Sequence, residues 1–162
     1  MAYTIQENAL LGQPIGDTST LQRHALGTIV RAKDPLYGAG EFIYLKGVGS
    51  TVAGSVVLYN PDDYSTSLLA ANDIGPVAVA MSANVSGQYG WYQVGGKAIV
   101  KAATVADNGN VFATGTPGTV DDAVVAGDRI KNAKFASADG TPSAGLAECE
   151  IARPFMDDGV AA

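Results

Sequence analysis

Histidine and cysteine, the side chains that most often carry chemistry, occur once each in this chain, as His24 and Cys149. A hydrolytic triad or a histidine metal site needs an imidazole held close to a nucleophile or to other ligands. His24 lies in a polar stretch near the start of the sequence, which is an insecure platform for preorganised catalysis. Cys149 alternates with Glu148 and Glu150 onto an apolar strand face, where a thiol behaves as a small hydrophobe. We therefore expect neither residue to be catalytic, and we expect that the protein is not an enzyme.

Acidic residues form three adjacent pairs, Asp62–Asp63, Asp121–Asp122 and Asp157–Asp158. A calcium loop needs several oxygen ligands at alternating positions, and none of the pairs has that spacing. Turn or cap roles explain each pair more simply. The glycine pair at 95–96 and the glycine-rich segment 87–90 lack the following helix of a phosphate-binding loop. The sequence thus predicts no metal site and no cofactor.

Trp91 lies close to Tyr89 and directly before Tyr92, which suggests an aromatic platform for a sugar ring. Neighbouring residues of a strand point to opposite faces, so Trp91 and Tyr92 cannot share one platform. We favour the interpretation that one of them anchors the core or a contact between subunits.

The overall charge excludes some partners. The 162 residues carry 16 acidic and 10 basic side chains, a net charge of −6, and the basic residues are scattered singly. Nucleic-acid-binding proteins cluster their Lys and Arg, so we expect no nucleic-acid partner. No stretch approaches the roughly 20 apolar residues that cross a bilayer, and no secretory signal is visible, so we expect no membrane partner and synthesis in a cytoplasm. Charged residues make up only 16% of the chain, which indicates that another protein covers part of its surface.

Short apolar runs interrupted by Gly, Pro, Asn and Asp dominate the sequence, and we place the elements from them. They predict strands at residues 28–33, 41–48, 55–59, 67–70, 77–83, 111–114, 129–135 and 146–153. Residues 91–94 and 97–101 are predicted to form a hairpin whose two-residue turn is Gly95–Gly96. The fold class is all-β, a single-domain antiparallel β-sandwich or β-barrel with an extended N-terminal arm.

The first 26 residues differ from the rest because they are polar and show no clear periodicity. We predict an extended arm at 1–26 that orders on a partner, and a β-rich body at 27–162. The alternative is an irregular leader that lies on its own domain. The candidate partner-binding residues of the arm are Ile5, Leu10, Leu11, Pro14, Ile15 and Leu21.

Several segments of the body resemble small virion proteins of tailed bacteriophages, namely the head decoration or cement proteins. The similar segments are 27–35, 40–47, 75–83, 90–96 and 123–130, and the likeness runs from about Gly27 to Phe155. The resemblance implies an all-β homo-oligomer, often a trimer, that sits on the outer surface of the capsid where subunits of the major capsid protein meet. It offers no catalytic residues.

These considerations predict a structural virion protein that stabilises a phage capsid by bridging neighbouring capsid subunits. The principal alternative is a receptor- or glycan-binding module of a phage head fibre or tail. A small hydrolase ranks third.

Overall fold

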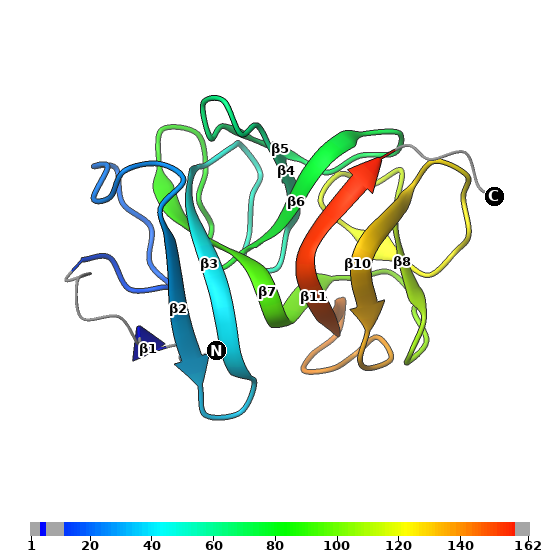
Figure 1. The fold of residues 1–162 in the computed structure, drawn as a ribbon. Helices are drawn as coiled ribbons and strands as arrows, with labels where there is room; N and C mark the ends of the chain where they lie inside the picture. Colours follow the sequence, from blue (N-terminus) through cyan, green and yellow to red (C-terminus); the bar gives the residue numbers. More distant parts are fainter. Residues whose placement is uncertain (1–3, 6–11, 158–162) are drawn as a thin grey trace.

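A computed structural model describes residues 4–5 and 12–157, which form one antiparallel sheet and, within these ranges, no helix (Figure 1). The prediction of an all-β, single-domain antiparallel fold is confirmed. The strands are β1 (Thr4–Ile5), β2 (Ile29–Asp34), β3 (Gly38–Lys46), β4 (Val56–Tyr59), β5 (Thr66–Leu68), β6 (Ile74–Ala80), β7 (Tyr89–Lys101), β8 (Asn110–Ala113), β9 (Val120–Asp121), β10 (Arg129–Phe135) and β11 (Leu146–Asp157). Among these segments there is none that could cross a membrane as a helix.

The eleven-stranded sheet follows the order β1-β2-β3-β7-β6-β11-β10-β8-β9, and β4 and β5 branch from β6. The path ends at β1 and β9, and these two strands do not pair with each other, so the sheet is not closed. The β-barrel, one of the two architectures that the sequence allowed, is therefore wrong. In Figure 1, β2 and β3 lie on one side of the molecule, β10 and β11 lie on the other, and β7 runs between them.

The predicted hairpin at Gly95–Gly96 is wrong, because β7 continues through both glycines. Its first half pairs with β3 and β6, whereas its second half pairs with β11, through Ala98 opposite Cys149 among others. The register with β3 shifts at this point, which marks a bulge. Gly96 has φ of +94°, and a Cβ there would lie 2.3 Å from the carbonyl oxygen of Ala39. The glycines therefore bend one long strand and allow a close backbone approach.

The largest core cluster is formed by side chains from strands β4 and β6 to β11. Alternate residues of β7 and β11 point into it, as the strand period requires. Its members come from β4, β6, β7, β8, β9, β10 and β11 and include Val56, Val77, Val79, Ala98, Val100, Val111, Val120, Ile130, Phe135, Ala147, Cys149, Ile151 and Met156. This arrangement makes β7 and β11 the central supports of the fold.

A second core cluster joins β2, β3 and β7 to residues 12–26, which we call the segment before β2. It contains Ile15, Val30, Ala32, Phe42, Tyr44, Met81 and Trp91. Both central strands and this segment are therefore held by apolar packing, and the segment before β2 shares the core of the body.

Candidate interaction surface

Gln13 fastens the segment before β2 to the sheet through both its side chain and its backbone. Its side-chain Nε2 donates to the carbonyl oxygens of Asp17 (2.6 Å) and Tyr89 (2.9 Å). Its Oε1 accepts the hydroxyl proton of Tyr44 at 2.7 Å, and its backbone oxygen accepts Nε1–H of Trp91 at 2.8 Å. Gln13 is itself buried, so these bonds are shielded from water. We call Gln13, His24, Tyr44, Tyr89 and Trp91 the Gln13 cluster.

His24 completes the Gln13 cluster by packing on its aromatic rings. Its ring centroid lies 5.1 Å from that of Tyr44, edge-on, and 5.0 Å from that of Trp91. The backbone N–H of Gln13 points at His24 Nε2 at a distance of 3.4 Å. Burial lowers the pKa of His24 below its ordinary value, which favours the neutral ring that can accept this hydrogen. These contacts give His24 a packing role in the Gln13 cluster.

The structure places the six candidate partner-binding residues differently from one another. Ile15 is only 2% exposed and packs in the second core cluster, and its role in contacting a partner stays a prediction. Ile15 is buried because residues 12–26 lie on their own domain, fixed by the Gln13 cluster and by backbone bonds between Ser19 and Tyr89. Pro14 is exposed, and Leu21 is 62% exposed.

The remaining three candidates lie at or before the start of this segment. Ile5 belongs to β1, whose backbone pairs with Ala32 and Lys33 of β2. Leu10 and Leu11 lie outside the described residues. A role for residues 1–11 in contacting a partner stays a prediction.

Cys149 is buried in the main core cluster, as its alternating pattern predicted. Burial raises the pKa of its thiol to about 12, so the thiolate is strongly disfavoured at neutral pH.

The turn role predicted for the acidic pairs is seen at Asp63 and Asp121, whose carboxylates accept N–H groups two residues ahead, but not at Asp122 or Asp157. Asp63 accepts the N–H and the hydroxyl of Ser65, Asp121 accepts the N–H of Ala123, and Asp122 accepts the N–H of Ala106. Asp157 forms an ion pair with Lys131. Within residues 4–5 and 12–157, no three His, Cys, Asp or Glu side chains come together as metal ligands would.

Trp91 and Tyr92 are both fully buried, on opposite faces of β7, which confirms that they anchor the core. Neither ring is available to stack on a sugar.

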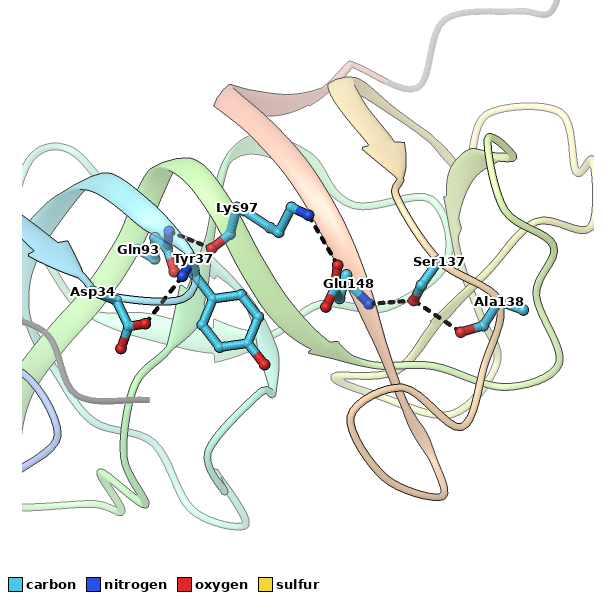
Figure 2. Close-up of polar contacts among 7 residues, drawn as sticks. All are labelled: Asp34, Tyr37, Gln93, Lys97, Ser137, Ala138 and Glu148. Carbon is cyan, nitrogen blue, oxygen red and sulfur yellow. Dashed lines mark hydrogen bonds and ion pairs between the residues drawn. The ribbon is translucent and has the colours of Figure 1, made fainter.

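Polar contacts reinforce the join between the two central strands. Figure 2 shows the ion pair between Lys97 of β7 and Glu148 of β11, whose Nζ and Oε2 are 3.0 Å apart. Glu148 raises the pKa of Lys97 through this hydrogen bond and its charge. The backbone N–H of Glu148 in turn donates to Ser137 Oγ at 2.9 Å. The pair of strands β7 and β11 is therefore stabilised by polar contacts on its solvent face as well as by apolar packing in its core.

Large apolar side chains are exposed at several places, among them Leu21, Ile74 and the two sites described next. The loop between β9 and β10 has four consecutive exposed apolar residues, 123–126, with Val124 at 79% exposure. At the turn between β2 and β3, Leu36 is also 79% exposed and lies at a groove of about 600 Å³. Contiguous exposed apolar surface, as in the β9–β10 loop, marks sites that bind other proteins. The sequence analysis did not predict this exposed loop. The available signal was the run of four apolar residues at 123–126, which acidic residues flank on both sides.

The N base of the head fibre protein gp8.5 of bacteriophage phi29 has a similar fold. Its crystal structure superposes on this chain with a TM-score of 0.50 and 15% sequence identity, over 75% of this chain and 97% of that one. No family model matches the sequence, and no curated protein matches it either. The likeness thus concerns the fold: an all-β body that this chain has in common with the base of a phage head fibre.

Proposed function

We propose that this chain is a structural protein of a phage head, bound to the outer surface of the capsid. The observation that carries the proposal is the fold shared with the phi29 head fibre base, which extends over three quarters of this chain. The proposal has no catalytic step, and the packing roles of His24 and Cys149 accord with that.

The finer part of the proposal is that the protein stabilises the shell by bridging neighbouring subunits of the major capsid protein. A stiff body suits this task, since a sheet whose central strands β7 and β11 are each paired on both sides deforms little under load. Many copies on one lattice would multiply the effect of each weak contact, because the lattice already positions neighbouring sites. We further propose that the copies are trimers made in the host cytoplasm.

Co-sedimentation of the purified protein with emptied capsids tests the proposal. We expect saturable binding and capsids that resist heat better when the protein is bound. Protein that remains in the supernatant at every concentration would refute it. The mass in solution, measured in parallel, should be three times the 16.5 kDa of one chain.

The role of the N-terminal region needs a deletion that leaves the core intact. Removing residues 1–26 would take away Gln13 and Ile15 and so damage the body. Removing residues 1–11 spares both. If these residues carry capsid contacts, the shortened protein should sediment with capsids less than the full chain does. Equal sedimentation would show that the capsid contacts lie elsewhere.

A receptor- or glycan-binding module of a phage head fibre or tail is the second candidate, and the likeness to gp8.5 supports only its head fibre part. A glycan array with the full chain tests this candidate. Trp91→Ala is unsuitable as the test variant because the ring is a core residue, whereas the half-buried Tyr37 can be replaced without opening the core. Specific sugar binding that Tyr37→Ala abolishes would support the second candidate over capsid cement.

A further inference from the structure

The apolar loop, which we define as residues 123–126 (Ala-Val-Val-Ala), is fully on the surface. Val124 is 79% exposed and Val125 is 48% exposed. A run of four exposed apolar residues is unfavourable in water and is kept where it has a function. Covering two valines at the tip of a loop with a partner would lower the free energy, because it removes apolar surface from water.

The ends of the apolar loop are fixed, so its shape is prepared before any partner arrives. On one side, Asp121 Oδ1 accepts the N–H of Ala123 at 3.1 Å, and Asp122 Oδ2 accepts the N–H of Ala106 at 2.8 Å. On the other side, the buried Asp128 accepts the N–H of Asn72 at 2.7 Å through Oδ1. A loop held in this way loses little conformational entropy when it binds.

The groove at the β2–β3 turn is lined mainly by aliphatic side chains, as the apolar loop is made of them. Ile15, Met81 and Ile99 supply buried side chains to its lining, and Leu36 and Leu146 line it further out. The carboxylate of Asp34, which also lines it, already accepts the N–H groups of Leu36 (2.7 Å) and Tyr37 (3.0 Å). Its chemistry suits a short aliphatic segment.

We propose that the apolar loop of one copy inserts into the groove of the next copy of this chain. The two features cannot meet within one molecule, because the β9–β10 loop and the β2–β3 turn lie on opposite sides of it (Figure 1). A contact between two different patches is head-to-tail, and it closes into a ring if the rotation between copies allows.

The charges around the two patches favour the same pairing. Asp121 and Asp122 precede the apolar loop, whereas Lys101 of β7 pairs with Leu146, which lines the groove. Lys101 is two residues from Ile99 and therefore on the same face of β7. Opposite charges at the rims orient the approaching copies and disfavour contacts between like patches.

This contact deepens the homo-oligomer part of the proposed function, on which it rests, by naming the two surfaces. The test uses two variants that each damage one surface. Val124→Asp with Val125→Asp destroys the apolar loop, and Leu36→Asp damages the groove. The altered side chains are exposed, so the fold should be kept, and circular dichroism checks this. Ile74→Asp, at a 61% exposed isoleucine that belongs neither to the apolar loop nor to the groove lining, is the matched control.

Sedimentation velocity gives the decisive readout. We expect each damaged variant alone to self-associate on the order of a hundredfold more weakly than the wild type, while Ile74→Asp associates normally. An equimolar mixture of the two damaged variants should form heterodimers, because each pair keeps one intact loop and one intact groove. A contact between like patches would give no such rescue.

The inference would be overturned by wild-type protein that stays monomeric, by damaged variants that associate normally, or by a mixture that stays monomeric. Loss of association on deleting residues 1–11, with Leu36→Asp unaffected, would assign the contact to those residues and would also overturn it. Capsid co-sedimentation of the monomeric variants is read separately. Association without any capsid binding would refute the proposed function and leave this contact standing.

Discussion

Replacing Gln13 by Ala should detach the segment before β2 from the sheet. The change removes two donated hydrogen bonds, to the carbonyl oxygens of Asp17 and Tyr89, and one accepted from Tyr44. It leaves the buried Tyr44 hydroxyl without the acceptor to which it donates. The bond from Trp91 Nε1 to the backbone of residue 13 can form only if the segment stays in place.

The size of the effect follows from the number and the burial of these bonds. A typical internal hydrogen bond contributes about 1 kcal/mol net, and a buried polar group left unpaired costs about 1–3 kcal/mol. We therefore expect Gln13→Ala to lower the free energy of unfolding by about 3 kcal/mol. For a domain of this size the melting temperature should fall by about 10 °C.

Denaturant unfolding followed by tryptophan fluorescence is the assay, since Trp91 is the one tryptophan of the chain and lies in the Gln13 cluster. Its emission should shift to longer wavelength in native Gln13→Ala as water reaches the ring. The control is Gln22→Ala, because Gln22 is an exposed glutamine of the same segment whose side chain donates to the nearby carbonyl oxygen of His24. If both variants unfold at the same denaturant concentration, the Gln13 side chain does not hold the segment and our reasoning is refuted.

Three further predictions concern the central strands. Gly96→Val should lower the free energy of unfolding by about 2–4 kcal/mol, because φ is +94° and a Cβ would meet the carbonyl oxygen of Ala39. Gly95→Ala, where there is room for a Cβ, should lower it by less than about 1 kcal/mol. Chemical denaturation of both variants makes the comparison. Cys149 should react with a thiol reagent no faster than the protein unfolds, and rapid labelling of native protein would contradict its burial. Cys149 and Tyr92 both have folded-state pKa values of about 12, above their unfolded values. Stability contributed by their neutral forms is complete below pH 9 and should be lost as the pH rises from about 9 to 12, so a melting temperature that stays constant over this window would argue against their burial.

Much of the secondary structure could be read locally. The runs of Val, Ile and aromatic residues predicted β2, β3, β4 and β10 to within a few residues, because β-branched and aromatic side chains are enriched in strands. The alternation around Cys149 was likewise sufficient to place its thiol in the core. Such properties depend only on near neighbours along the chain.

The failure at Gly95–Gly96 has a long-range cause. Two adjacent glycines between apolar runs are typical of a tight turn, and no local signal separates a turn from a bulge. The outcome was decided by partners far away in sequence, since β3 and β11 pair with successive halves of β7. Gln13 was missed for a similar reason, because its hydrogen-bond partners Tyr44, Tyr89 and Trp91 lie 31 to 78 residues away.

By itself the sequence determined the all-β class, the turn roles of Asp63 and Asp121 and the burial of its single cysteine, because period and propensity act over a few residues. Only the tertiary structure decided that residues 12–26 belong to the body, that the sheet stays open, and that a rigid apolar loop and an apolar groove lie on opposite sides. These depend on which distant strands pair, and the free energy of that choice is spread over the whole core.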